Sequence, residues 1–519
     1  MTSSQLSIDD VTRRAKSVIP TMRVNLDSAQ LKGVRNIINA LKSGGLSVGI
    51  GPPGTGKTVV FNITHFDIVD HMDKNEIILY VAPTNRLVEE CSLRTAALLL
   101  LKGYTMSDLR NILRIYGSRF KPDKLHEDVK IVFTTPYQPG ALKYLLKIKN
   151  TVHLMIDEAS TTPLHGPFIE IAMTMAEAIR KKRVEWLRSF SVIGDPMQAI
   201  VEEYTFPEKL KYLIVGRLLT KPLPPYELDV IKQDPALIFQ YAPDHFNALG
   251  VKYFFLDKTY RIPNPSELIV SEPFYHGLLK GVPSCKERLR DIKDEKQDII
   301  SIIRSKRRLL KDPIINTAVN ALDSQIPVIY IKDRGPSYAY KIPIRGEIYS
   351  PKRRPAEIDE LDIVRARLAA EIAAFLCATT QDNIKIEVLT PYIEMKTQIQ
   401  LYLREIFSEK STMNIEHRLR TSTIHSALGS EADVVVVTMG KEYRGKSEDE
   451  FTRTIYFHTP ELVNIQFSRH RRLLVIIGDI ERLAKNFKKE RYFTSISKLA
   501  NVIKDLKERG FVITTTIGD

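Results

Sequence analysis

The feature that most constrains the fold is an eight-residue loop, Gly51-Pro52-Pro53-Gly54-Thr55-Gly56-Lys57-Thr58, which fits the pattern G-x-x-x-x-G-K-[ST]. The apolar residues 46–50 before it can form a strand, and residues 59–63 after it can begin a helix. In this order the glycines let backbone N–H groups surround phosphate oxygens, and the helix N-terminus adds a positive dipole end. The pattern predicts a bound nucleoside triphosphate, with Lys57 on its β- and γ-phosphates and the Thr58 hydroxyl on Mg²⁺.

A capped helix is expected just ahead of this loop. Asp27 or Ser28 can cap a helix that runs to about residue 42 and ends near Gly44-Gly45. Gln30 lies in this helix, and its amide can both donate and accept hydrogen bonds, as recognition of an adenine edge requires. An exposed helical glutamine is the alternative, and the position ahead of the loop favours the adenine contact.

Short apolar runs alternate with helical stretches after the loop. Four of them are typical of buried strands: 77–81, 130–133, 152–156 and 190–193. Continuous apolar strands separated by helices indicate a parallel sheet covered on both faces. Such sheets bind ligands at the carboxyl ends of their strands, and each of these runs is followed there by a polar cluster.

Two adjacent acids, Asp157 and Glu158, follow the third of these strands. Asp157 would hold Mg²⁺ opposite Thr58, and Glu158 would orient and activate the attacking water. Gln198, after the neighbouring strand, could bridge the γ-phosphate and this water. The alternative is that Asp157 and Glu158 are two ordinary surface acids. Their position favours the catalytic interpretation, because they lie roughly a hundred residues past the loop and directly after an apolar strand.

A second set of strands is expected at 327–331, 384–389, 434–437 and 473–477, with an amphipathic helix from about 358 to 376 between the first two. This half carries no phosphate loop of its own. The chain is therefore predicted to form two α/β domains with short helical insertions. The expected boundaries are an N-terminal arm (1–24), a first domain (25–250, insertion about 203–248), a second domain (251–487, basic helical insertion about 280–323), and a C-terminal helix and tail (488–519).

The composition suits a multi-domain protein with a polyanionic partner. The 519 residues exceed one compact core, and 76 Lys and Arg against 62 Asp and Glu give a net charge of +14. Such a charge favours nucleic acid, with a merely solubilising basic surface as the alternative. The three cysteines are too scattered for a zinc or iron–sulfur motif. Lacking a membrane-spanning run or a secretory signal, the chain is expected to be intracellular, cytoplasmic or nuclear if eukaryotic, with no membrane partner.

The ordered motifs resemble those of superfamily-one helicases. The matching segments are 51–58, 157–160, 194–198 and 464–471. The segment 256–265, followed by 273–277, is similar to the corresponding part of the up-frameshift-like branch, which includes senataxin-type enzymes. The resemblance covers roughly residues 25 to 479. It implies two RecA-like parallel-sheet domains of the P-loop NTPase fold, with ATP and Mg²⁺ as cofactors.

The resemblance also implies roles for four residues of the second half. Tyr260 would stack on the adenine, and Arg261 would reach the γ-phosphate. Arg469 resembles the second arginine finger, with Arg471 as a supporting contact. Cations supplied by a second domain would make catalysis depend on domain closure. A basic helix end favoured by the helix dipole is the alternative for Arg469 and Arg471.

Residues 423–433 resemble the motif that commonly contacts the ribose. Gly429 and Glu431 match its Gly-x-Glu core, and Glu431 would make the ribose contact. Leu428 stands where many relatives carry glutamine, which puts that glutamine's contact in doubt.

Three loops resemble those that hold the phosphates of a nucleic-acid strand: Pro83-Thr84-Asn85, Thr134-Thr135-Pro136 and Thr390-Pro391-Tyr392. Backbone amides and small hydroxyls grip phosphates without reading bases, which permits movement along any sequence. Ordinary strand-end turns rich in Pro, Asn and Thr are the alternative. Thr423 and His425 are further candidates, and His425 could equally pack inside the protein.

These features predict an ATP-dependent helicase or translocase, a monomeric motor on single-stranded DNA or RNA, which by resemblance moves from 5′ to 3′. The alternative is a nucleic-acid-stimulated ATPase that clamps or remodels nucleoprotein complexes without processive unwinding, since no N-terminal barrel is expected. A third interpretation, which the net charge of +14 disfavours, is a P-loop ATPase that acts on proteins. The sequence does not separate DNA from RNA, because a phosphate grip does not reveal a 2′-hydroxyl contact.

Overall fold

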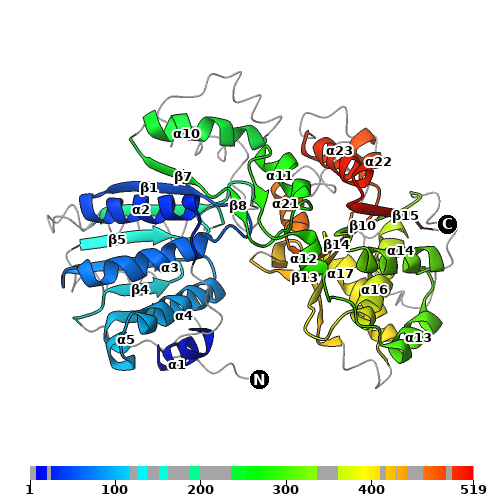
Figure 1. Ribbon diagram of the computed structural model, residues 1–519, viewed down its shortest axis with the longest axis horizontal. Coiled ribbons are helices and arrows are strands. Elements are labelled where there is room, and N and C mark those ends of the chain that lie inside the picture. The colour runs from blue at the N-terminus through cyan, green and yellow to red at the C-terminus, as the bar shows by residue number, and fades with distance from the viewer. Residues whose placement is uncertain are drawn as a thin grey trace. The chain divides into compact units, whose positions relative to one another are not determined.

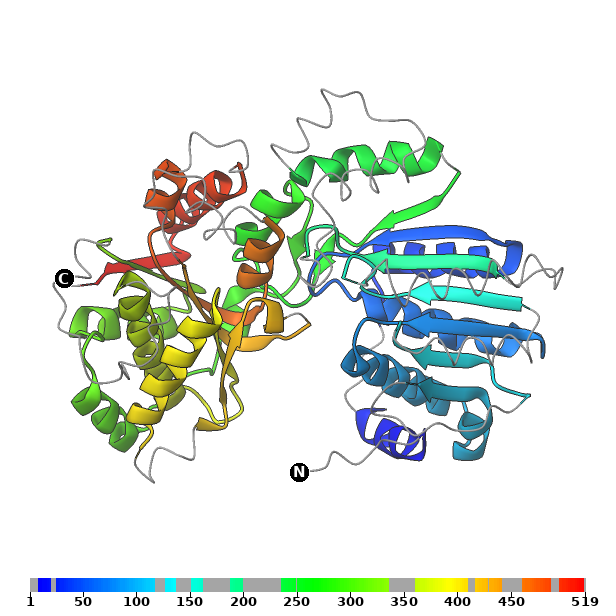
Figure 2. The ribbon, with the colours of Figure 1, turned by 180° about the vertical axis from the view of Figure 1, so that it is seen from behind.

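The computed structural model describes residues 8–19, 25–116, 127–136, 151–161, 187–198, 235–248, 250–335, 360–408, 416–427, 429–440, 460–486 and 494–517. The chain divides into two compact units, residues 1–224 with 239–257 and residues 225–238 with 258–519. Each unit contains a parallel sheet with helices packed against it (Figures 1 and 2). The fold class is therefore α/β with two parallel-sheet units, as predicted.

Among the described residues, the sheet of the first unit has seven strands. They are β1 (Gly45–Ile50), β2 (Glu76–Val81), β3 (Leu113–Tyr116), β4 (Ile131–Thr134), β5 (Thr151–Ile156), β6 (Leu187–Gly194) and β7 (Lys252–Phe255). Their order is β3-β4-β2-β5-β6-β1-β7, and every pairing is parallel. The four predicted strands after the loop are confirmed as β2, β4, β5 and β6, whereas β3 was not predicted.

Strand β7 lies in the first sheet, although we expected the second domain to begin at residue 251. It pairs with β1 from Ser47↔Lys252 to Ile50↔Phe255. The ring of Phe254 occupies the space that a side chain at residue 49 would need, because a Cβ added to Gly49 would lie 2.3 Å from the Phe254 Cζ atom. This close approach of a ring to a glycine fixes β7 in the core of the first unit.

The helices of the first unit are α1 (Ile8–Val18), α2 (Ser28–Ser43), α3 (Lys57–Ile68), η2 (Val69–His71), α4 (Asn85–Leu101), α5 (Met106–Ile112) and α10 (Ile238–Ala248). Figure 1 shows α2, α3 and α4 in front of the strands, and Figure 2 shows the sheet from the other side. Asp27 caps α2 with a capping box, as expected. Part of the expected polar arm is instead helical, because Val11 and Ala15 of α1 are buried in the core of this unit.

In the part of the chain that the structure describes, the sheet of the second unit has six strands, again all parallel. They are β10 (Val328–Lys332), β11 (Ile386–Thr390), β12 (Leu419–Thr423), β13 (Ala432–Thr438), β14 (His470–Ile477) and β15 (Val512–Thr516), in the order β12-β11-β13-β14-β10-β15. A short pair, β8 (Lys258–Thr259) and β9 (Lys280–Gly281), stands apart. The four predicted strands are confirmed as β10, β11, β13 and β14. The expected C-terminal tail contains β15, which pairs with β10.

The helical elements of the second unit are η4 (Pro235–Leu237), α11 (Leu268–Tyr275), α12 (Cys285–Leu289), α13 (Gln297–Lys306), α14 (Asp312–Asp323), α16 (Glu360–Thr379), α17 (Ile393–Ile406), η5 (His425–Ala427), α21 (Pro460–Phe467), α22 (Ile480–Asn486) and α23 (Thr494–Glu508). The segment expected to be a basic helical insertion contains α12, α13 and α14. Of the insertion expected at about 203–248, residues 203–234 lie outside the described residues, as does Leu428. In the described part of the chain, no helix is both long and apolar enough to cross a membrane.

The helix expected at 358–376 to be amphipathic is instead buried along its length. Four charged side chains of α16 are at most 1% exposed: Asp362, Arg365, Arg367 and Glu371. All four take part in buried ion pairs: Arg365 with Asp333 at 2.7 Å and with Asp362 at 3.9 Å, and Arg367 with Glu371 at 2.6 Å. Buried charges are tolerated when they are paired in this way, so polar residues here do not mark a solvent-facing side.

Candidate active site

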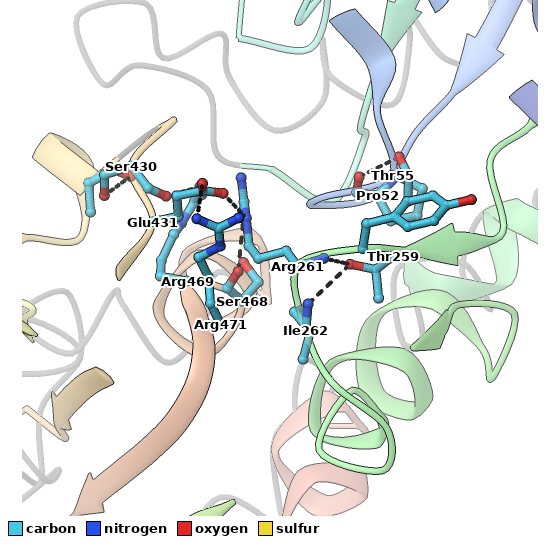
Figure 3. Close-up of polar contacts among 12 residues, drawn as sticks. Pro52, Thr55, Thr259, Arg261, Ile262, Ser430, Glu431, Ser468, Arg469 and Arg471 are labelled. Carbon is cyan, nitrogen blue, oxygen red and sulfur yellow. Dashed lines mark hydrogen bonds and ion pairs between the residues drawn. The ribbon is translucent and has the colours of Figure 1, made fainter. Parts of the chain in front are cut away.

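The glycine-rich loop connects β1 to α3 at the carboxyl edge of the first sheet. Thr55 closes it, since its hydroxyl donates to the Pro52 carbonyl at 2.8 Å (Figure 3). Lys57 is only 7% exposed, and its Nζ donates to the Gly51 carbonyl at 2.8 Å. The same Nζ lies 3.3 Å from Glu158 Oε1. The lysine charge is thus held inside the curve of the loop, where phosphate oxygens bind in P-loop proteins.

Gln30 supports the loop from α2. Its Nε2 donates to the Thr55 carbonyl at 2.9 Å, and its Oε1 accepts from the Asp27 N–H at 3.2 Å. Gly56 has φ +84° and begins α3, and a Cβ there would lie 2.6 Å from Gln30 Nε2. The structure therefore gives this buried glutamine a positioning role. Its adenine contact stays a prediction. The side-chain amide carries a second N–H hydrogen and a second oxygen lone pair with which it could make that contact.

Asp157 is fully buried at the end of β5, and its carboxylate is surrounded by donors. Its Oδ2 accepts from the hydroxyls of Thr58 and Tyr80, each at 2.7 Å, and its Oδ1 accepts from the Glu158 N–H at 2.9 Å. Burial first, and then the neighbouring charge of Glu158, raise the pKa of the Asp157 carboxyl. Thr58 and Asp157 thus meet as the sequence predicted, although they lie far apart in the chain.

This pair fits Mg²⁺. A hydroxyl and a carboxylate oxygen are hard ligands, and Mg²⁺ usually takes only one or two protein ligands together with substrate phosphates and water. Among the described residues, no group of three or more His, Cys, Asp or Glu side chains gathers into a protein-only metal cage. Thr58 and Asp157 would therefore hold the metal jointly with the phosphates of the nucleotide.

Glu158 and Gln198 complete the polar residues of this edge. Glu158 adopts φ +48°, a left-handed backbone that is uncommon for a residue with a side chain and often accompanies functional sites. Gln198 is buried, and its Nε2 donates to Asp195 Oδ2 at 3.2 Å. Asp195 in turn accepts from the Met197 N–H at 3.0 Å. The Gln198 amide is thus held at the end of β6, one strand away from Glu158.

The predicted nucleic-acid loops of the first unit differ in exposure. Thr84 is exposed and caps α4, because its Oγ1 accepts from the Leu87 N–H at 3.3 Å. Pro83 and Asn85 beside it are half-buried. By contrast, Thr134, Thr135 and Pro136 are buried in this structure. Only the first of the two loops presents a hydroxyl to solvent.

The second unit brings together three of the residues assigned to the nucleotide (Figure 3). Arg261 Nε donates to Glu431 Oε2 at 2.9 Å, and Arg471 Nη1 lies 3.3 Å from Glu431 Oε1. Arg261 also donates to the Ser468 carbonyl at 3.4 Å. Glu431 therefore bridges two arginines in this structure, and its ribose contact stays a prediction.

Arg469 is almost completely buried, at 1% exposure. Its Nε donates to the Ile465 carbonyl at 3.2 Å and its Nη1 to the Ser430 carbonyl at 3.3 Å. A phosphate contact would require this buried guanidinium to become accessible. Of the remaining assigned residues, Tyr260 is half-buried and Gly429 is exposed.

The predicted nucleic-acid residues of the second unit lie at the ends of β11 and β12. Thr390 and Pro391 are buried, and Tyr392 is half-buried before the first residue of α17. The Thr423 hydroxyl accepts from the Ser426 N–H at 3.3 Å, which closes the turn after β12. His425 in that turn is half-buried.

Two residues that contact candidate site residues, Tyr80 and Arg288, were missed by the sequence reasoning. Tyr80 was taken only as part of a buried strand, and its apolar neighbours gave no sign that its hydroxyl reaches Asp157. Arg288 lies near Arg471 and Arg472, and burial first and then these like charges lower its pKa. The basic character of residues 280–323 was the only available signal for Arg288.

Fold and site together define a chain of two parallel-sheet units, the first of which carries a phosphate loop of the P-loop type. Residues 32–187 match the DEAD/DEAH box helicase family, and residues 243–481 match an AAA domain family. Each of these matches covers less than half of the chain. No curated protein matches the chain in sequence.

A solved structure, the complex of Arterivirus nonstructural protein 10 (helicase) with DNA, is similar at 12% sequence identity with a TM-score of 0.32. The alignment covers 88% of this chain and 64% of that one, so this chain spans less than two thirds of the viral protein's length.

Proposed function

We propose that the chain is an ATP-driven motor of the up-frameshift-like branch that moves on single-stranded nucleic acid, from 5′ to 3′, and unwinds duplexes. The observation that carries this proposal is the contact between Thr58 and Asp157 beside the pair formed by Lys57 and Glu158. A P-loop lysine and hydroxyl, a metal-holding aspartate and an adjacent glutamate are the parts that hydrolysis of ATP requires.

In this proposal each group of the first unit has one task. Lys57 binds the β- and γ-phosphates, and Thr58 with Asp157 holds Mg²⁺. Bound Mg²⁺ would neutralise charge on the phosphates. Glu158 then leaves Lys57 and accepts a proton from the attacking water, while Gln198 orients that water. The pairing of Glu158 with Lys57 keeps the acid close to where the γ-phosphate would lie.

The second unit would supply cations to the transferring phosphoryl group. Arg261 and Arg471 share one carboxylate, that of Glu431, so this cluster has a surplus of positive charge. We assign Arg261 and Arg469 to the γ-phosphate, with Arg471 in support, and Tyr260 and Glu431 to the adenosine. Cations that reach the phosphates only after closure would couple hydrolysis to movement along the strand.

The strand itself would be held by Thr84 and its neighbours in the first unit and by the turns near Tyr392 and His425 in the second. The net charge of +14 supports a polyanionic track. Contacts to phosphates predict binding that weakens steeply with salt, because counterions are released on association. We assign the motor to a monomer and leave the choice between DNA and RNA to experiment.

ATP turnover of the full chain tests this proposal, measured without nucleic acid, with single-stranded DNA and with single-stranded RNA. Lys57→Ala supplies the blank. We expect strong stimulation by at least one polymer. A lack of stimulation by both would contradict the nucleic-acid motor and favour an ATPase that acts on proteins.

A second assay tests movement, using duplexes with a single 5′ or 3′ overhang. Unwinding of the 5′-tailed duplex alone is expected. Unwinding of only the 3′-tailed duplex would contradict the polarity. A duplex left intact during rapid, strand-stimulated turnover would favour an ATPase that clamps nucleoprotein complexes.

A further inference from the structure

A fully buried tyrosine hydroxyl contacts the metal-binding carboxylate of the proposed ATP site. Tyr80 and Asp157 both have zero exposure, and the Tyr80 hydroxyl donates to Asp157 Oδ2 at 2.7 Å. The two residues come from adjacent strands, because β2 pairs with β5 in register and the Asp157 N–H donates to the Val81 carbonyl at 2.9 Å. Both the backbone and the side chains of these strands thus fix the carboxylate.

The ring of Tyr80 is held in place by aromatic neighbours. Its centroid lies 5.7 Å from that of Phe61, 5.9 Å from that of His65 and 5.6 Å from that of Phe133. The first two contacts are edge-to-face, a favourable geometry for rings in a core. A ring enclosed in this way cannot swing toward phosphates, so its hydroxyl serves Asp157 alone among the groups of the site.

Packing does not explain the hydroxyl. A phenylalanine would fill the same space, and burying a hydroxyl is unfavourable unless it finds a partner. Here the partner is the oxygen that also accepts from Thr58, and Cys91 lies within hydrogen-bonding reach of the same hydroxyl. The phenol is a neutral donor, so it fixes the direction of the carboxylate without supplying a compensating cation.

We propose that Tyr80 is a positioning residue for metal binding: its hydroxyl orients the Asp157 carboxylate for Mg²⁺. The inference rests on the proposed ATP site and adds to it a residue outside the loop and the acidic pair. Groups that orient metal ligands commonly change metal affinity by about 10–100-fold when they are removed.

The test is equilibrium binding of a fluorescent, non-hydrolysable ATP analogue to the full chain, with and without Mg²⁺. For Tyr80→Phe we expect the dissociation constant of the metal-free analogue to stay within about twofold of wild type, because the loop is intact. The Mg²⁺ concentration that gives half of the metal-dependent gain in affinity should rise about tenfold. This separation of the two constants distinguishes a role in metal binding from general damage to the site.

Tyr330→Phe is the matched control. Tyr330 is 1% exposed on β10, a strand of the second sheet, and its hydroxyl accepts from the Ile480 N–H at 2.9 Å. This variant loses one buried tyrosine hydrogen bond without touching the metal site, so both binding constants should stay at wild-type values. The affinity for metal-free analogue also reports whether each variant is folded.

Three outcomes would overturn the proposal. An unchanged Mg²⁺ requirement in Tyr80→Phe would refute the role of Tyr80 alone. An equal loss of metal-free and metal-dependent affinity would show a structural role instead. A wild-type chain whose nucleotide affinity ignored Mg²⁺ would refute the metal site itself, and the role of Tyr80 with it.

Discussion

Two buried aspartates, one in each unit, directly follow a strand of a parallel sheet but have opposite surroundings. Asp157 directly follows β5 and Asp333 directly follows β10, so both lie at the carboxyl edge of a parallel sheet, and neither is more than 3% exposed. The side-chain donors to Asp157 are the neutral hydroxyls of Thr58 and Tyr80, whereas those to Asp333 are the guanidinium groups of Arg365 and Arg482.

The pKa values of the two carboxyl groups reflect this difference. Burial raises the pKa of Asp157, and the charge of Glu158 adds to the effect. Burial also acts to raise the pKa of Asp333, but the charges of Arg365 and Arg482 outweigh it and lower the pKa overall. A buried carboxylate held by neutral donors still needs a cation, whereas one held by two arginines does not. An aspartate that follows a parallel strand therefore forms an internal ion pair in the second unit, whereas in the first unit it keeps only neutral side-chain donors, at the place where we propose that it binds metal.

The largest expected effect belongs to the acid beside Asp157. Glu158→Gln should lower ATP turnover about 1,000-fold, because the amide cannot accept the proton of the attacking water. Binding of ATP should persist, since Lys57 and Thr58 are unchanged. Glu89→Gln is a suitable control, because Glu89 pairs with Arg14 on α1, away from the loop. Near-normal turnover of Glu158→Gln would remove the catalytic assignment.

The next effect sharpens the contrast between the aspartates. Asp333→Asn should lower the free energy of unfolding by about 3 kcal/mol, because it leaves the fully buried Arg365 without its main counter-ion. Asp157→Asn should not destabilise the metal-free chain, because it removes a buried charge that neutral donors do not compensate. Chemical denaturation of both variants without Mg²⁺ checks this. Equal destabilisation by the two would break the comparison.

The pH dependence of the Asp333 effect has a definite sign. Because the folded pKa lies below the unfolded value, the stabilisation by Asp333 is present above about pH 4 and is lost as the pH falls through the folded pKa. The difference between wild type and Asp333→Asn should therefore be complete at pH 7 and shrink below about pH 4. A difference that grew on acidification would contradict the ion-pair explanation.

Arg261 should show a smaller effect on turnover. Arg261→Ala is expected to lower turnover about 100-fold, because it removes one of the cations that we propose stabilise the transferring phosphoryl group. Arg472→Ala is the matched control, since Arg472 lies in the same unit and pairs with a different acid, Asp433, at 3.2 Å. Equal turnover of the two variants would contradict the role given to Arg261.

The sequence predicted the parts of the site that follow from local patterns. The glycines and spacing of the loop indicated that Lys57 and Thr58 are phosphate-site residues. Because the carboxyl ends of parallel strands share one sheet edge, Thr58 and Asp157 could be predicted to lie close together. The sequence could not predict contacts made by tertiary packing alone. Tyr80 reads as one more apolar-strand residue, and the charges of Arg365 and Arg367 read as a solvent-facing side of a helix until their partners are known.

Residues that belong to one sequence motif also differ in how deeply they are buried. Arg469 and Arg471 belong to one motif, yet the first is 1% exposed and the second is a partly exposed partner of Glu431. From its sequence, β15 was predicted to be part of a threonine-rich tail. It forms a strand by pairing with β10, about 180 residues earlier in the chain. Such long-range pairings leave no periodic signal in the strand itself.

The smallest effect concerns the exposed loop of the first unit, where Thr84 caps α4. Thr84→Ala should cost about 1 kcal/mol in the free energy of unfolding through loss of the cap. It should also weaken single-strand binding a few-fold, about the value of one modest hydrogen bond to a phosphate.

Thr105→Ala is the matched control, because Thr105 caps α5 in the same unit and should lose similar stability without loss of strand affinity. Thr84→Ser should restore both properties, since it keeps the hydroxyl. If Thr84→Ala and Thr105→Ala bound single strands equally well, Thr84 would be a helix cap and nothing more. The strand-binding role in the first unit would then have to come from backbone amides.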